Sequence, residues 1–138
     1  MGLANFGVTL DVCHSLMAGE TPAAAATLAL REGRLFGVHL NDGYGAADDG
    51  LMVGSVRPWE LLDLLLALRR GDYAGTLYFD TFPVREDPVR EGAANIAAVR
   101  RWEAVLDRID AAELEEAQAA HDALRIEAIV RSAEGGDG

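Results

Sequence analysis

The stretch Thr9-Leu10-Asp11-Val12-Cys13-His14 sets the interpretation of the whole sequence, because an apolar run stops there at side chains that bind metal ions. The run from Phe6 to Leu10 has the length and composition of a short β-strand. It ends abruptly at Asp11, and His14 follows three positions later. A carboxylate and an imidazole therefore stand together just past the end of the first expected strand.

Two later apolar runs end in the same way. They are Leu35-Phe36-Gly37-Val38-His39 and Thr76-Leu77-Tyr78-Phe79-Asp80. Helical patterns cover residues 23–31 and 59–70 between the runs, and another covers residues 89–110 after them. Strand and helix thus alternate, which is the sequence form of consecutive βα units with parallel strands.

The three strand ends are expected to converge on one point. In (β/α)8 barrels the C-terminal ends of the strands share one face, and the active site is built there. Asp11, His39 and Asp80 would then lie close enough to share one cation. We expect an α/β protein that forms part of a (β/α)8 barrel, its last three βα units with parallel strands, plus an extra C-terminal helix.

The domain organisation follows from the same patterns. Residues 1–110 are expected to be the C-terminal part of such a barrel, 111–132 one further charged helix, and 133–138 a disordered tail. Residues 41–54 are rich in Gly and Asp without periodicity, which predicts a loop long enough to suggest a functional role.

Composition excludes several classes of partner. The chain has 138 residues, half of them hydrophobic, and a net charge of -11 with every basic residue an arginine. Such an acidic chain disfavours nucleic acid and anionic membrane surfaces as partners. It contains no long apolar run, shows no signal peptide at Met1, and has a single cysteine, Cys13, which excludes an internal disulfide. These features predict a cytoplasmic protein.

Each candidate ligand also has an ordinary structural explanation. Asp11 can cap the segment after it, and His14 can be a plain loop histidine. His39 can be a buried structural histidine, Asp80 a turn residue, and Asp48 a solvated loop acid. The spacing of the set is much harder to explain by chance, because carboxylates with an imidazole at successive strand ends suit Mg²⁺ or Mn²⁺.

Four motifs resemble the last three βα units of xylose isomerase-like barrels, and in pattern they are most similar to the sugar isomerase and L-rhamnose isomerase branch. The resemblance covers roughly residues 5 to 109. The motifs, in chain order, are Asp11-Val-Cys-His14 with Leu16-Met-Ala-Gly19, Val38-His39-Leu-Asn-Asp42, Asp48-Asp-Gly-Leu-Met-Val-Gly54 and Tyr78-Phe-Asp80-Thr-Phe-Pro-Val-Arg85.

The resemblance implies a metal-dependent intramolecular oxidoreductase. One metal would use Asp11, His39 and Asp80, and a second, catalytic metal would use His14 and Asp48, which would be the catalytic residues. The implied metals are Mn²⁺ or Mg²⁺, with Co²⁺ and Zn²⁺ as alternatives. The implied reaction is the interconversion of an aldose and a ketose, on a small sugar substrate, by a hydride shift that the metals assist as Lewis acids.

The sequence departs from that family in two ways. Only three of eight strands are visible, and Gly50 stands where the family's loop has the second aspartate of Asp-x-Asp. We therefore expect a C-terminal fragment that is inactive alone and acts as a homo-oligomer or with a partner carrying the missing barrel half. Two alternatives stay open: a one-metal sugar epimerase or dehydratase type of enzyme, and an inactive fragment or a subunit that needs a second chain.

Overall fold

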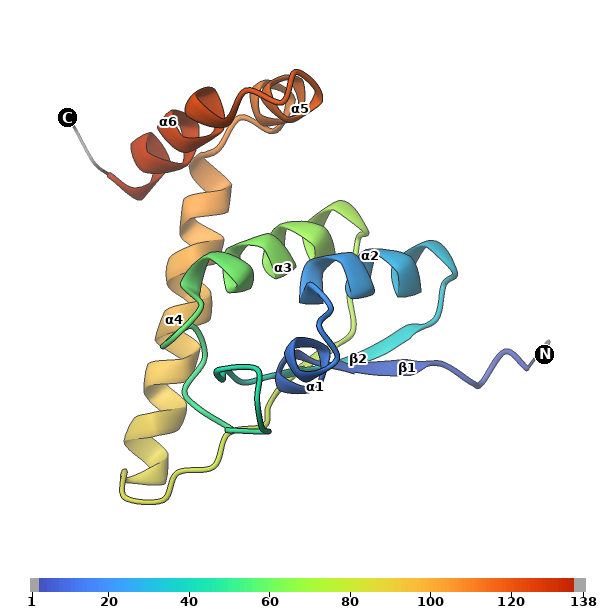
Figure 1. Cartoon of the computed structure of the whole chain (residues 1–138), viewed down its shortest axis with the longest axis vertical. Helices are drawn as coiled ribbons and strands as arrows, with labels where there is room; N and C mark the ends of the chain where they lie inside the picture. Colours follow the sequence, from blue (N-terminus) through green and yellow to red (C-terminus); the bar gives the residue numbers. More distant parts are fainter. Residues whose placement is uncertain (1–2, 136–138) are drawn as a thin grey trace. The chain divides into compact units, whose positions relative to one another are not determined.

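The computed structural model describes residues 3–135 (Figure 1). Over this part of the chain it contains a sheet of three strands and six helices. In chain order the elements are β1 (Val8–Asp11), α1 (Val12–Met17), α2 (Pro22–Arg31), β2 (Leu35–Leu40), α3 (Pro58–Arg70), β3 (Thr76–Phe79), α4 (Pro88–Arg108), α5 (Ala111–Ala119) and α6 (Ala123–Glu134).

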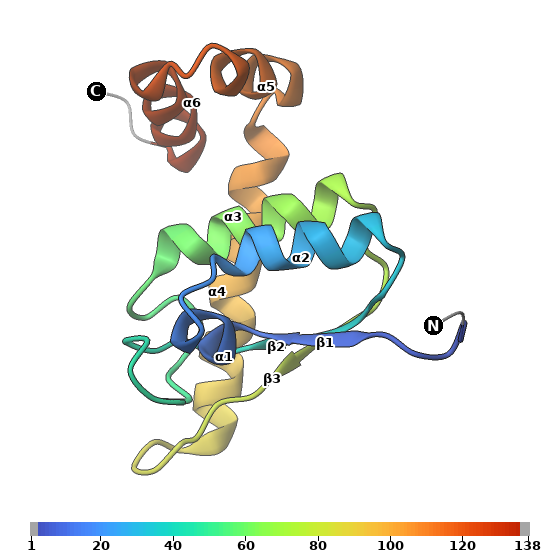
Figure 2. The same cartoon turned by 45° about the vertical axis from the view of Figure 1, so that its right-hand side comes forward.

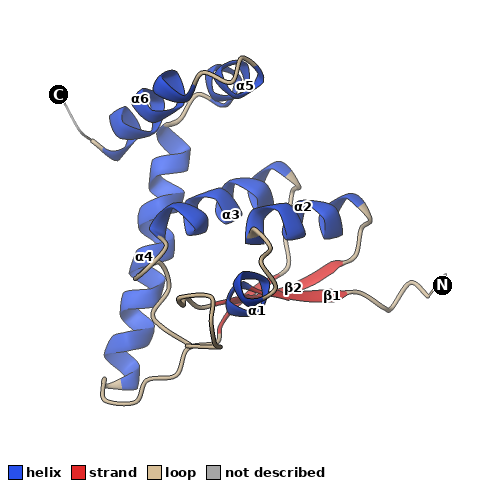
Figure 3. Cartoon of the chain, viewed as in Figure 1, coloured by secondary structure: helices blue, strands red, loops and turns tan. Residues whose placement is uncertain are grey.

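The sheet is parallel throughout and has the strand order β1-β2-β3. Figure 3 shows its strands in red. Its register pairs Asp11 with His39 and His39 with Tyr78, so these three residues form one row across the sheet. The neighbouring row pairs Leu10 with Val38. Because side chains alternate between the faces of a strand, the first row points to one face and the second row to the other.

Helices α2 and α3 lie side by side over one face of the sheet (Figures 1 and 2). Each begins with a proline at its first position, where the missing N–H costs nothing. The leucine-rich face of α3 is buried, and so are Leu10, Val38 and Leu40 of the strands. The opposite face is open, with Tyr78 58% exposed, so the row that holds Asp11 and His39 remains accessible.

The expected partial (β/α)8 barrel is wrong. The structure has a small open sheet of three strands and six helices, and neither its strand order nor its size shows three βα units of a barrel. Two helices, α1 and α2, separate β1 from β2, because Asp11 ends the strand and caps a helix at once. Three strands about 4.8 Å apart cannot curl into a closed barrel. The protein is therefore described as an α/β structure with an open parallel sheet.

The expected single C-terminal helix over residues 111–132 is also wrong, because α5 and α6 are separate helices. The break comes at His121, whose φ of 53° is left-handed and ends a helix. Asp122 then caps α6 by accepting the backbone N–H of Arg125 at 3.0 Å. Of the tail expected to be disordered, residues 133 and 134 belong to α6, and residues 136–138 lie outside the described residues.

The chain divides into two compact units, Met1–Val99 and Arg100–Gly138. The first unit holds the sheet, helices α1 to α3 and the start of α4. The second holds the end of α4 with α5 and α6. Within residues 3–135, no helix has both the length and the apolar character needed to cross a bilayer.

Candidate metal centre

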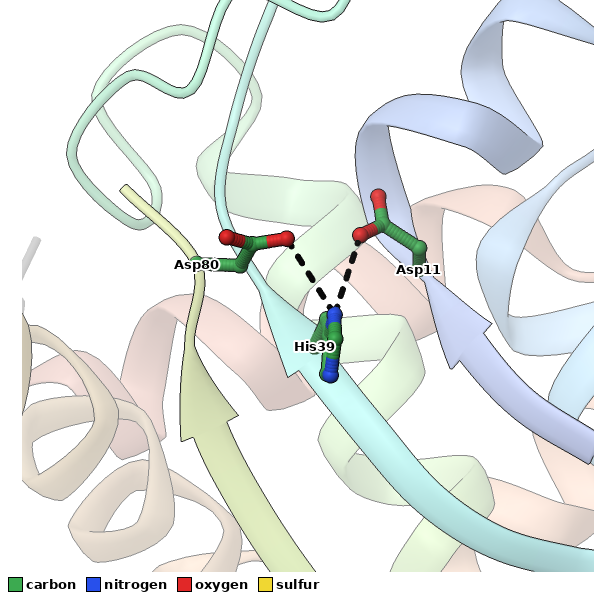
Figure 4. Close-up of side chains that lie close together, drawn as sticks. All are labelled: Asp11, His39 and Asp80. Atoms are coloured by element: carbon green, nitrogen blue, oxygen red, sulfur yellow. Dashed lines mark hydrogen bonds and ion pairs between the residues drawn. The ribbon is translucent and has the colours of Figure 1, made fainter. Parts of the chain in front are cut away.

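The centre of the site is the imidazole of His39, which faces two carboxylates (Figure 4). Its Nδ1 lies 3.2 Å from Oδ2 of Asp80 and 3.4 Å from Oδ2 of Asp11. One donor atom from each of the three residues lies within 4.8 Å of the other two. The three strand ends singled out in the sequence therefore meet in space.

Backbone structure fixes each of these side chains. Asp11 and His39 are register partners on adjacent strands. Asp80 lies one residue beyond β3, and its N–H donates to the carbonyl oxygen of Leu40 at 3.0 Å, which extends the pairing of β2 with β3. All three are half-buried, so the cluster is anchored by the sheet yet open to solvent on one side.

The donor set fits a hard divalent cation. Ligands 2.0 to 2.6 Å from one ion in octahedral or looser geometry lie about 3 to 3.7 Å from each other. The two distances from His39 to the carboxylate oxygens are in that range. Two carboxylates and one imidazole are also the ligand types that suit Mn²⁺ and Mg²⁺.

A second group of donors shares Asp11 with the first. It consists of Asp11, His14 and Asp48, with one donor atom of each within 4.8 Å of the others. His14 Nε2 lies 3.5 Å from Oδ2 of Asp48. The other oxygen of Asp48, Oδ1, is buried and has no hydrogen-bond partner in the described protein. A buried carboxylate oxygen without a donor is costly, and a bound cation would remove that cost.

The loop over residues 41–57 places Asp48, and Asp42 holds this loop. Asp42 and Leu51 exchange two backbone hydrogen bonds of 3.0 and 2.9 Å. The buried carboxylate of Asp42 also accepts the backbone N–H groups of Gly43, Val56 and Arg57 at 2.8 to 2.9 Å. One side chain therefore joins both ends of the loop, which makes it a fixed structure that can present a ligand.

Neither Asp49 nor Gly50 supplies the ligand that the second aspartate of the Asp-x-Asp motif would supply. Oδ2 of Asp49 accepts the N–H of Tyr44 at 2.7 Å, so this carboxylate serves the loop and is absent from both donor groups found in residues 3–135. Gly50 has a φ of 57°, and a Cβ there would lie 2.2 Å from the ring of Phe82. An aspartate is excluded at position 50 in this conformation, and the second group keeps three donors.

Three participants were missed at the level of sequence. Asn41 donates to Asp11 from a buried position, Asp42 holds the loop, and the ring of Tyr78 lies 5.2 Å from that of His39. The polar pair Asn41-Asp42 directly after an apolar strand was the available signal. For Tyr78 the signal was its position two residues before Asp80, on the same face of the strand.

Cys13 lies beside the site but is poorly suited to bind a metal. It is 1% exposed, and its thiol donates to the carbonyl oxygen of Asp42 at 3.1 Å. Burial raises the pKa of the Cys13 thiol above its ordinary value. The sulfur is thus a neutral thiol at physiological pH, whereas a metal ligand must be a thiolate.

All five residues expected to bind metal therefore lie in two adjoining groups within the first unit: Asp11, His14, His39, Asp48 and Asp80. The sequence matches no protein-family model, and no curated protein matches it. The resemblance accordingly rests on the motifs alone, and the geometry shows two groups of side chains that could hold a metal ion.

Proposed function

We propose that this chain carries the metal-binding part of a metal-dependent sugar isomerase. The single observation behind the proposal is the arrangement of His39 between Asp11 and Asp80 at 3.4 and 3.2 Å. The three donors come from three separate segments, residues 11, 39 and 80, so no local sequence preference explains their meeting. The four motifs that resemble the xylose isomerase-like family add the substrate class and the reaction.

The cation would be Mn²⁺ or Mg²⁺. When bound, it polarises the carbonyl and hydroxyl oxygens of a sugar and so assists a hydride shift between neighbouring carbons. Asp11, His39 and Asp80 would hold it, because the register of β1 with β2 and the bond from the Asp80 N–H to Leu40 keep their donor atoms together. His14 and Asp48 form the adjoining group next to the open face, where a small polyhydroxylated substrate can approach.

The proposal also includes a surface for a partner chain, formed by the outer edges of strands β1 and β3. Three protein donors leave coordination positions of a six-coordinate ion unfilled. The outer edges of β1 and β3 have no neighbouring strand in the described part of the chain. A second copy or another chain that pairs with an edge would supply further ligands and substrate contacts beside the site.

A one-metal epimerase or dehydratase is the second candidate, and Gly50 favours it. The position at which the family has a further carboxylate is closed to any side chain by the contact with Phe82. A weakened second group would leave one metal, with side chains moving protons. Metal stoichiometry separates the two candidates, since the isomerase proposal requires two bound ions and the alternative requires one.

The test is a calorimetric titration of the full chain with Mn²⁺. Wild type is expected to bind Mn²⁺, and His39→Ala is expected to abolish the site formed with Asp11 and Asp80. His121→Asn is the matched control, because it removes an imidazole from the second unit and asparagine tolerates the left-handed backbone there. Equal binding by wild type and His39→Ala would refute the proposed centre.

Substrate class is tested in the same sample with a sugar alcohol such as xylitol, which offers adjacent hydroxyl groups without reacting. Protein-bound Mn²⁺ is expected to broaden the proton NMR lines of the polyol in wild type. The broadening should be weaker in His39→Ala at the same total Mn²⁺ concentration, because this variant loses one of the two proposed sites. Broadening that is identical in both samples would show that only free Mn²⁺ contacts the polyol.

A further inference from the structure

The side chain of Asn41 connects the metal-binding carboxylate of Asp11 to the start of helix α1. Its Nδ2 donates to Oδ1 of Asp11 at 3.2 Å, and its Oδ1 accepts the backbone N–H of Cys13 at 2.9 Å. Asn41 is only 3% exposed. It therefore makes both bonds away from bulk water, where hydrogen bonds hold geometry most firmly.

The orientation of the Asn41 amide is determined by its partners. The N–H of Cys13 can only donate, so the atom facing it must be the amide oxygen. The NH₂ group then necessarily faces the carboxylate of Asp11, which can only accept while it is ionised. Aspartate would place an acceptor oxygen against the acceptor Oδ1 of Asp11, and an aliphatic residue would offer no donor.

The second bond to Oδ1 of Asp11 comes from the N–H of His14 at 3.1 Å. Both donors approach the same oxygen, so Oδ1 is occupied and Oδ2 is left facing Nδ1 of His39 at 3.4 Å. Rotation of the carboxylate would break both bonds. The two contacts thus fix which oxygen of Asp11 is offered to the site.

We infer that Asn41 is a positioning residue of the metal centre, which orients the Asp11 carboxylate so that Oδ2 is presented beside His39. This inference rests on the proposed function, since it concerns the same site. Partners that orient a metal ligand through a hydrogen bond typically contribute 10- to 100-fold to metal affinity. Asn41 acts through Asp11 and does not itself belong to either donor group in residues 3–135.

The experiment compares Mn²⁺ affinity in wild type, Asn41→Ala, Asn41→Leu and Ser15→Ala, all in the full chain. Ser15 is the matched control, because its buried hydroxyl donates to the backbone oxygen of Asp11 at 2.8 Å and does not contact the carboxylate. The Kd for Mn²⁺ is expected to rise about 10- to 100-fold in both Asn41 variants. In Ser15→Ala it should stay within about two-fold of wild type, because no bond to a ligand atom is lost.

A spectroscopic readout separates positioning from simple destabilisation. With saturating Co²⁺ in place of Mn²⁺, the visible d–d absorption reports the ligands around the ion. It is expected to change in Asn41→Ala and Asn41→Leu and to remain as in wild type for Ser15→Ala. Thermal unfolding of the metal-free proteins shows how much stability each variant loses, and Asn41→Leu keeps the buried volume if the alanine variant is poorly folded.

The outcomes are distinguishable. Wild type that fails to bind Mn²⁺ overturns the proposed function and this inference together. Wild type that binds, with Asn41 variants of equal affinity and unchanged Co²⁺ spectrum, overturns this inference alone. Loss of affinity in Ser15→Ala equal to that in the Asn41 variants, or unfolding of both metal-free Asn41 variants, would make Asn41 a folding residue and also overturn it.

Discussion

The carboxylate of Asp11 accepts the backbone N–H of His14 at 3.1 Å, so one side chain both caps helix α1 and faces His39 in the candidate metal centre. Its Oδ1 is occupied by this cap and its Oδ2 faces His39. Asp11 also belongs to both donor groups. The end of strand β1, the start of α1 and the two groups of ligands therefore depend on one residue.

The first prediction separates the two roles of Asp11. Asp11→Asn keeps an acceptor oxygen for the His14 N–H, so the free energy of unfolding of the metal-free protein should change by less than about 0.5 kcal/mol. Asp11→Ala loses the cap and should cost about 1 kcal/mol. Both variants should lose Mn²⁺ binding, because a negative charge is removed from each donor group. Urea unfolding without metal and calorimetry with Mn²⁺ measure the two effects, and retained Mn²⁺ binding in Asp11→Asn would contradict the shared role.

The second prediction concerns the number of ions bound. The isomerase proposal requires a second ion at Asp11, His14 and Asp48, so Asp48→Asn should reduce the Mn²⁺ stoichiometry from two to one. Asp49→Asn is the control, because an asparagine oxygen can still accept the N–H of Tyr44 and Asp49 lies outside the donor groups found. Mass spectrometry of the native protein with added Mn²⁺ gives the count. A count of one in both wild type and Asp48→Asn would favour the one-metal candidate.

The third prediction concerns alkaline pH and Cys13. Burial raises the pKa of this thiol above the ordinary value of 9.0, so the folded state holds the proton more tightly than the unfolded state. The stability contributed by the protonated thiol is complete below pH 9.0 and is lost as the pH rises from there through the folded-state pKa. Wild type should therefore lose stability faster than Cys13→Ala as the pH rises above 9.0 in thermal melts. Parallel pH profiles for the two proteins would contradict a raised pKa.

The fourth prediction concerns self-association. The outer edges of β1 and β3 carry no further strand in residues 3–135, and unpaired edges pair with other chains. The net charge of -11 opposes association by repulsion, which salt screens. The mass measured by light scattering should therefore exceed that of one chain and should rise between 0.05 and 0.5 M NaCl, roughly the range over which the screening length falls below 10 Å. A mass of 14.7 kDa at every salt concentration would show that the edges are protected.

The sequence alone located the three strands to within one or two residues and showed which ligand types stand near their C-terminal ends. The apolar runs that lead to Asp11, His39 and Asp80 are local patterns, and the structure ends β1 at Asp11, β2 at Leu40 and β3 at Phe79, each within one residue of these side chains. Because parallel strands present their C-terminal ends on one edge, the meeting of these residues also followed from the pattern once the strands were assigned.

Only the tertiary structure decided the rest. It showed an open sheet where a barrel segment was expected, and two helices separated at His121 where one helix over residues 111–132 was expected. It also showed that the Asn41 side chain donates a hydrogen bond to Asp11, and that the Asp49 carboxylate accepts one from the backbone of Tyr44. These depend on contacts between segments far apart in the chain, or on whether a single polar side chain caps a helix or stays in solvent. The sequence is compatible with several partners for each of these polar side chains, and tertiary packing determines which partner each one has.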